Sequence, residues 1–148
     1  MNTILTSLLT TNARNWAAVP LRVGLGLPLA AHGAQKLFGW FGGYGLHATA
    51  AFFGQNLGLH PALLWATLAG CGEFLGGLAI LAGCATRFAA LTTGIVMAVA
   101  VWAVHPGGFF APNGIEFPLA LLLSSLALLL SGGGALSFDA GLARPRAE

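Results

Sequence analysis

Charged residues are scarce in this chain. Four acidic and six basic side chains make up only 7% of its 148 residues, whereas about 25% of the residues in soluble domains are charged. At the same time 57% of the residues are hydrophobic. A chain of this composition cannot cover a water-facing surface, so it predicts a membrane protein whose first partner is the lipid bilayer. The few scattered basic residues exclude a nucleic-acid-binding surface.

Motifs for metal and thiol chemistry are also missing. The chain has no CxxC, HxxxH or ExxH spacing, which argues against a metal site and against a dithiol relay within the chain. Its two cysteines, Cys71 and Cys84, are 13 positions apart. On one helix this spacing corresponds to about 20 Å, far beyond the reach of a disulfide. We therefore expect both cysteines to be small apolar core residues.

Long apolar stretches are what the chain does have. A helix needs about 20 apolar residues to cross a bilayer, and four stretches qualify as spans: 16–38, 62–82, 88–104 and 117–136. The segment between the first two spans contains LHATAAFFGQNLG, which is typical of a short interfacial helix. The prediction is an all-α, four-helix transmembrane bundle forming a single domain over 1–148. Residues 1–13 and 140–148 are expected to be peripheral.

The distribution of basic residues predicts the orientation of these spans. With four crossings, Arg14, Arg87, Arg144 and Arg146 flank the spans on one side, and the other side has Lys36. Cytoplasmic loops carry the excess of lysine and arginine. We therefore expect a multi-pass protein of the plasma membrane with both termini in the cytoplasm.

A single carboxylate interrupts the second span. Glu73 is the only charged residue between positions 62 and 82, and a charge at that depth costs several kcal/mol unless it is satisfied. Small residues fall on the same side of this helix, which predicts that Glu73 faces other helices: Ala66, Ala69, Gly70, Gly76 and Gly77. Arg22, in the first span, is the partner predicted from its depth. The pair either fixes the register of two helices or binds a ligand or a proton.

A second polar cluster is predicted at the outer ends of the spans. His32 and Lys36 are four residues apart and share a helix face, and His105 and Glu116 flank the outer loop between the last two spans. Histidine transfers protons near neutral pH and hydrogen-bonds carbonyl groups. The four residues are therefore either ordinary interfacial residues in water or a redox or proton-coupled site.

Aromatic residues surround this outer cluster. The segment HPGGFFAPNGIE cannot continue a helix and is expected to cap the bundle. Four rings lie near it in the sequence: Trp102, Phe109, Phe110 and Phe117. They either sandwich a flat ring or form the aromatic belt found at membrane interfaces.

These elements, taken in order, resemble the DoxX family of small bacterial membrane proteins. The resemblance rests on four segments over about residues 20–140: RVGLGLPLAAHGAQKLFG, GEFLGGLAILAGCATRFAAL, HPGGFF and GIEFPLALL. It implies a four-helix bundle in the bacterial inner membrane and a link to redox chemistry, because a distant relative is the membrane subunit of a thiosulfate:quinone oxidoreductase. The missing CxxC separates this chain from membrane proteins that exchange thiols and disulfides.

Three functions remain open on this basis. The first is a quinone-linked redox subunit, with quinone as a candidate ligand, no covalently bound cofactor, and a soluble or membrane oxidoreductase as the electron-supplying partner. It predicts a cleft that opens sideways between the spans and reaches a polar cluster. The second is a non-enzymatic membrane scaffold, which predicts a tightly packed bundle. The third is a small-solute transporter subunit, which requires a path past Glu73 and a homo-oligomer. The sequence identifies no catalytic residue and does not decide whether the chain is an enzyme.

Overall fold

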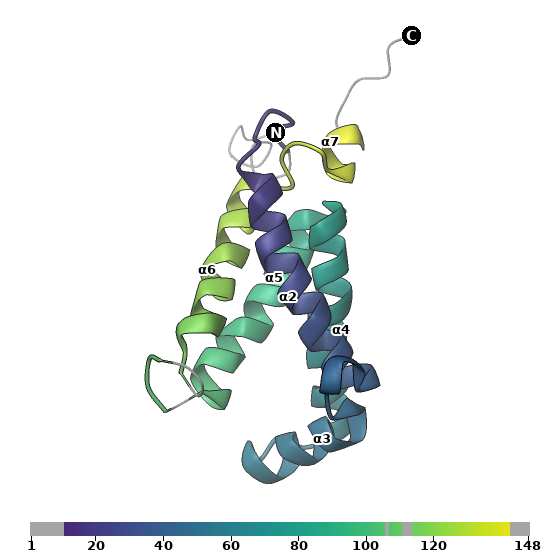
Figure 1. Ribbon diagram of the computed structural model, residues 1–148, viewed down its shortest axis with the longest axis vertical. Coiled ribbons are helices and arrows are strands. Elements are labelled where there is room, and N and C mark those ends of the chain that lie inside the picture. The colour runs from purple at the N-terminus through teal and green to yellow at the C-terminus, as the bar shows by residue number, and fades with distance from the viewer. Residues whose placement is uncertain (1–10, 106, 111–113, 143–148) are drawn as a thin grey trace.

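The computed structural model describes residues 11–105, 107–110 and 114–142, and every regular element in these ranges is helical. The long helices are α2 (Ala18–Phe38), α4 (Ala62–Ala82), α5 (Thr86–Val99) and α6 (Glu116–Ser131). The shorter ones are η1 (Trp40–Gly42), α3 (Gly45–Asn56), η2 (Ala100–Val104) and α7 (Phe138–Leu142). Figure 1 shows α2 and α4 side by side, with α3 at one end of the molecule and α7 at the other. We call these the α3 end and the α7 end.

Glycine ends several of these helices. The expected helix over 62–82 begins after Pro61 and ends at Gly83, whose φ of 66° lets its N–H bond back to the carbonyls of Ala79 and Ile80. Gly39 closes α2 in the same way, with a φ of 73° and a hydrogen bond to the carbonyl of Gln35. Glycine adopts this left-handed conformation without the steric cost that a Cβ atom would impose. The boundaries of α2 and α4 therefore follow from the sequence.

The short helix expected between the first two spans is present as α3, which follows η1 and precedes α4; its location at a membrane interface stays a prediction. The last expected span differs from the prediction. Helix α6 has 16 residues and ends at Ser131, and the glycine run that begins with Gly132 leads into α7. The third expected span continues from α5 into η2, a π-helical turn of five residues. Much of the outer cap and of the two peripheral segments lies outside the described residues.

Two helices are long and apolar enough to cross a membrane by length and composition: Ala62–Ala82 and Thr86–Val104. Helix α2 has the same length as α4 but is not among them, because Arg22, His32, Gln35 and Lys36 lower its hydropathy. Helix α6 is apolar but shorter. The all-helical fold is thus confirmed, and two of the four expected spans meet this criterion.

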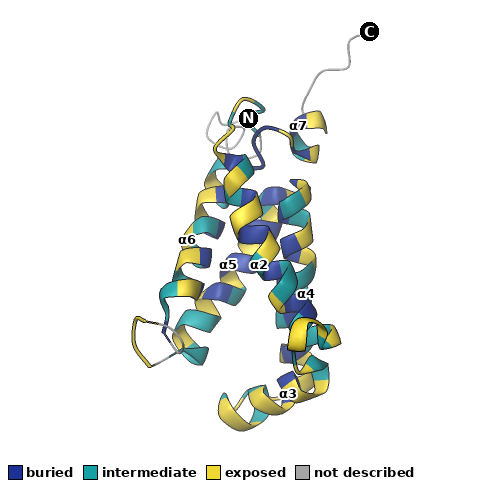
Figure 2. Ribbon diagram, viewed as in Figure 1, coloured by how far each residue is buried: buried dark blue, intermediate teal, exposed yellow. Residues whose placement is uncertain are grey.

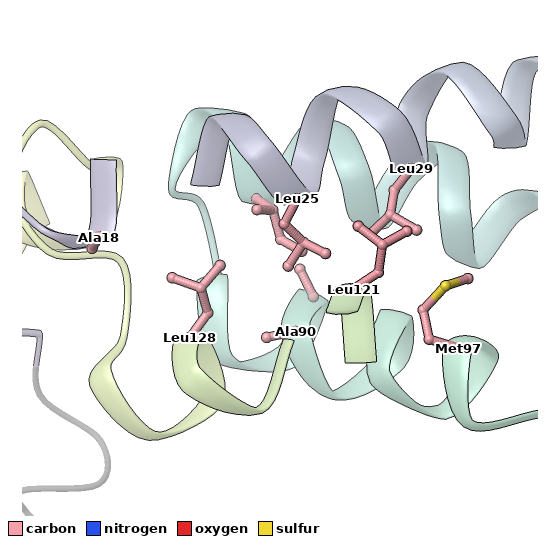
Figure 3. Close-up of a cluster of buried hydrophobic side chains, with 9 residues drawn as sticks. Ala18, Leu25, Leu29, Ala90, Met97, Leu121 and Leu128 are labelled. Carbon is pink, nitrogen blue, oxygen red and sulfur yellow. The ribbon is translucent and has the colours of Figure 1, made fainter. Parts of the chain in front are cut away.

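The buried core lies where α2, α5 and α6 meet, together with Ile80 of α4. Figure 3 shows Leu25 and Leu29 of α2 directed toward Leu121 of α6, with Met97 of α5 beside them. Many large apolar residues are exposed, for example Leu27, Leu75 and Leu130, and Figure 2 shows exposed positions along all the long helices. The helices therefore bury a narrow internal stripe and expose an apolar outer surface.

Candidate functional site

Close contact between α2 and α4 sets the level at which Glu73 lies. A Cβ atom added to Gly77 would be 2.7 Å from the carbonyl oxygen of Gly26, and one added to Gly33 would be 2.3 Å from the backbone nitrogen of Phe74. Only glycine allows the two backbones to approach this closely. Because Gly33 lies against Phe74, Glu73 is level with the C-terminal third of α2.

Glu73 pairs with Lys36. The Nζ atom of Lys36 donates a hydrogen bond to Oε2 of Glu73 at 2.5 Å, and the two side chains are 28% and 3% exposed respectively. The carboxylate thus faces a neighbouring helix, as the small residues of α4 predicted. The second oxygen, Oε1, makes no hydrogen bond to the described residues and is not among their fully buried unpaired atoms. It is therefore not fully buried, and Glu73 is one of the residues that line the cavity described below.

The predicted pair between Arg22 and Glu73 is wrong. Gly33, which marks the level of Glu73, lies eleven residues from Arg22 along α2, or about 16 Å at 1.5 Å per residue. Lys36 lies only three residues from Gly33, and its flexible stem spans the remaining gap. The depth estimate failed because it assumed that the start of the first span and the end of the second lie at the same level on the α7 side.

Arg22 instead holds the C-terminal segment. Its Nη2 atom donates hydrogen bonds to the carbonyl oxygens of Ala135 and Leu136, at 3.2 and 2.9 Å. The residue is 4% exposed and experiences the negative charge of Asp139. Asp139 in turn accepts hydrogen bonds from the backbone N–H groups of Ala85 and Thr86. Arg22 therefore binds the C-terminal segment to α2 at the α7 end of the bundle and is not part of the site around Glu73.

A large cleft opens beside the Lys36–Glu73 pair. Its volume is about 1490 Å³, and residues from α2, α3, α4, α5, η2 and α6 line it. Its walls are mostly apolar, with Leu29, Leu68, Met97 and Leu121 among them. In Figure 1, α5 and α6 diverge from α2 and α4 toward the α3 end. The cleft is thus a mostly apolar space whose wall contains one ion pair.

Three of the four residues predicted for the outer cluster line this cleft, namely His32, Lys36 and His105. The ring of His32 contacts that of Phe117, with centroids 5.8 Å apart, so α2 meets α6 at this point. His105 closes η2 and shares a hydrogen bond of 3.0 Å between its Nδ1 and the carbonyl oxygen of Ala100. Glu116 begins α6 and is not among the lining residues. The cleft thus brings Glu73 together with His32, Lys36 and His105.

The aromatic wall of the cleft differs from the expected one. Of the four predicted rings, only Phe117 lines the cleft, whereas Trp102 is 85% exposed. The other lining rings come from α3 and the residue before it, from α4 and from α5: Tyr44, Phe52, Phe53, Trp65 and Phe88. No sequence signal would have placed α3 beside the cleft, because its contacts depend on how the chain turns after α2.

The polar chemistry of the cleft is that of a hydrogen-bonding site. Within the described ranges, no three His, Cys, Asp or Glu side chains come close enough together to hold a metal ion. The Lys36 ammonium has three N–H donors, of which Glu73 takes one. The accessible Oε1 of Glu73 is an acceptor beside them. A ligand head group with a carbonyl or hydroxyl oxygen fits this arrangement.

Comparisons with known proteins agree with the resemblance seen in the sequence. Neither the comparison with curated proteins nor that with solved structures gave a match. The family model described as DoxX matches residues 17–106, which is more than half of the chain and includes α2, α3, α4, α5 and the cleft residues that they carry. The chain belongs to the DoxX family.

Proposed function

We propose that this chain, as a membrane protein of the DoxX family, crosses the bacterial inner membrane four times, through α2, α4, α5 with η2, and α6. Helix α2 has 21 residues, enough for a crossing, and α6 with the segment that follows it reaches a comparable length. The outward side chains support this proposal, since Leu27, Leu75 and Leu130 are 59–68% exposed. Such large apolar surfaces are unfavourable in water and favourable against lipid tails.

The orientation follows from the charges. Arg14 and Arg87 lie toward the α7 end, whereas Lys36 lies toward the α3 end. By the excess of basic residues in cytoplasmic loops, the α7 end faces the cytoplasm and α3 lies at the outer surface. Arg144 and Arg146 fall outside the described residues and follow α7 in the sequence.

The cleft binds a quinone in this proposal. The proposal depends on one observation: a mostly apolar space of about 1490 Å³ is lined by both members of the Lys36–Glu73 pair, of which Glu73 is buried. Pockets for drug-sized ligands measure about 300–1,000 Å³, so the space accommodates a ring together with part of a prenyl tail. The Lys36 ammonium would donate a hydrogen bond to a quinone carbonyl, and the lining aromatic rings would pack against the quinone ring.

The chain would act as the membrane subunit of a redox assembly. The sequence has no CxxC and no recognisable flavin or haem motif, so the proposal assigns the electron supply to a partner oxidoreductase. A bound quinone would provide the two-electron redox chemistry of its ring. This chain's own residues would hold the head group, separate it from the lipid and supply hydrogen bonds to its oxygen atoms.

The two alternative functions fit the geometry less well. A scaffold needs no internal space, so this function does not explain the large cleft. A transporter needs a continuous path past Glu73. Leu25, Ile80 and Leu128 have no exposed surface and fill the bundle on the α7 side of the cleft. A space that is open near the α3 end and filled toward the α7 end favours a binding site over a path.

Mass spectrometry of the protein purified in mild detergent tests the proposal. We expect quinone to co-purify in amounts comparable to the protein, and decylubiquinone to quench the fluorescence of Trp65, which lines the cleft. In the Ala69→Phe variant a ring would occupy the cleft, so quinone binding should fall about tenfold or more. Ala98→Phe is the matched control, because Ala98 is exposed on α5 and is not a lining residue. Equal binding by the wild type and both variants would place any quinone outside the cleft.

A further inference from the structure

The Lys36–Glu73 pair is balanced in charge. One ammonium and one carboxylate meet at 2.5 Å in the wall of the cleft, so the pair carries no net charge when both groups are ionised. The other titratable side chains among the lining residues are His32, Tyr44 and His105. The ion pair therefore makes this part of the cleft wall polar without adding a net charge.

We propose that this balance selects the ligand: the cleft accepts amphipathic molecules whose head group is uncharged and accepts hydrogen bonds, and it rejects anionic and cationic head groups. The inference rests on the proposed ligand cleft but not on quinone as its occupant. The selecting residues are Lys36 and Glu73 together. If one of the two charges is removed, the site should prefer ligands whose charge is opposite to the charge that remains.

The physical reason is the cost of an uncompensated charge. Apolar side chains such as Leu29, Leu68 and Leu121 form most of the cleft wall, and a charge placed among them loses its hydration. An anionic head group would be attracted to Lys36, but it would have to compete with Glu73, which already occupies that ammonium. A cationic head group would meet the same conflict with Lys36. A neutral oxygen atom avoids both conflicts, because it can take one of the remaining N–H donors without displacing the carboxylate.

The second carboxylate oxygen of Glu73, Oε1, adds a further preference for the head group of the ligand. Oε1 makes no hydrogen bond to the described residues and is not fully buried, and it lies beside the donors of Lys36. A head group with a hydroxyl next to a carbonyl would satisfy both partners at once. Anionic head groups, by contrast, would place like charges close together, which is strongly unfavourable in a space with little water.

The test uses three probes with the same brominated 11-carbon chain and different head groups: an alcohol, a sulfonate and a trimethylammonium. Bromine quenches tryptophan fluorescence at short range. The protein, in lipid nanodiscs at pH 8, keeps Trp65 as its single tryptophan, with Trp16, Trp40 and Trp102 changed to Phe; these three are 54–85% exposed. Each affinity is divided by that of the alcohol probe. This ratio is compared between variants. Partitioning of each probe into the lipid is the same for all variants and therefore cancels.

For the wild-type pair we expect the alcohol to bind about tenfold or more tightly than either charged probe. In Glu73→Gln, which leaves the ammonium unpaired, the sulfonate-to-alcohol ratio should rise by about tenfold or more. The double variant Lys36→Gln/Glu73→Gln is neutral again, so its ratio should return close to the wild-type value. Circular dichroism and thermal unfolding of each variant check the fold. If Glu73→Gln does not fold, the charge-reversed double variant Lys36→Glu/Glu73→Lys is used, and it should keep the preference for the alcohol.

An unchanged ratio in a folded Glu73→Gln protein would overturn the inference, as would a double variant that keeps the ratio of the single variant. These results do not depend on quinone. If no quinone co-purifies but the ratios change as expected, the selection by charge balance stands and the quinone proposal fails. If decylubiquinone binds in the cleft and the ratios do not change, the quinone proposal stands and the selection fails.

Discussion

Asp139 caps a helix that lies more than fifty residues before it in the chain. Its Oδ2 accepts a hydrogen bond from the backbone N–H of Thr86 at 2.9 Å, at the first residue of α5. A negative charge at this position also interacts favourably with the positive end of the helix dipole. The C-terminal segment therefore stabilises the start of α5 through a side chain that α5 itself does not provide.

The Asp139→Ala substitution should lower the stability of the fold. Loss of a capping side chain costs about 1 kcal/mol, and the nearby Arg22 would lose a compensating charge. Thermal unfolding in detergent, followed by circular dichroism, measures the effect. Asp139→Asn keeps an acceptor oxygen and should lose less stability than Asp139→Ala. Equal stability of both variants and the wild type would show that this cap contributes nothing.

Substitution of Gly77 should separate α2 from α4. A Cβ atom at Gly77 would lie 2.5 Å from the backbone nitrogen of Ala30 and 2.7 Å from the carbonyl oxygen of Gly26, and backbone atoms cannot move aside as a side chain can. Overpacking of this kind typically costs about 1–3 kcal/mol, so Gly77→Ala should melt at a lower temperature. The matched control is Gly24→Ala in α2, where a Cβ atom meets nothing within 4 Å. Stability of this control should stay constant or rise; an equal loss at both positions would contradict the tight contact.

Arg22 and Glu73 should have separable roles. Arg22→Met removes the hydrogen bonds to the carbonyls of Ala135 and Leu136, which should cost about 1–2 kcal/mol of stability. Ligand binding in the cleft should stay unchanged, because Arg22 does not line it. Glu73→Gln should change ligand binding while the C-terminal segment stays in place. Melting curves and Trp65 quenching, measured on both variants, check this separation, and a loss of binding in a folded Arg22→Met protein would contradict it.

Cys84 reports the orientation in the membrane. It is exposed in the turn between α4 and α5, which corrects the expectation that both cysteines are core residues. In a Cys71→Ala background, a membrane-impermeant maleimide should label Cys84 in inverted membrane vesicles and not in intact cells. His47→Cys, in a protein without other cysteines, is the matched control, since His47 is exposed on α3. It should be labelled in intact cells, and the reverse pattern would invert the proposed topology.

The sequence predicted the bounds of the helices better than the contacts between them. The bounds of α4 follow from Pro61 and Gly83, and the burial of Glu73 follows from the small residues on its face; both predictions are confirmed. The partner of Glu73 was predicted wrongly, because depth along two separate helices does not give their relative register. That register depends on contacts such as Gly26 against Gly77, which one sequence does not reveal.

The cleft itself was beyond prediction for a related reason. His32, Lys36 and His105 were identified correctly as residues of one end of the bundle, and all three line the cleft. The space between them depends on the divergence of α5 and α6 from α2 and α4 (Figure 1) and on the position of α3. These are properties of packing between distant segments, and local residue patterns carry no information about them.

A crystal structure of the protein grown in a lipidic mesophase with decylubiquinone tests the central proposal most directly. We predict that the quinone ring lies in the cleft, with one carbonyl oxygen within hydrogen-bonding distance of Lys36 Nζ and with the Lys36–Glu73 pair intact. A ring bound elsewhere, or a cleft filled by the protein's own side chains, would contradict the account.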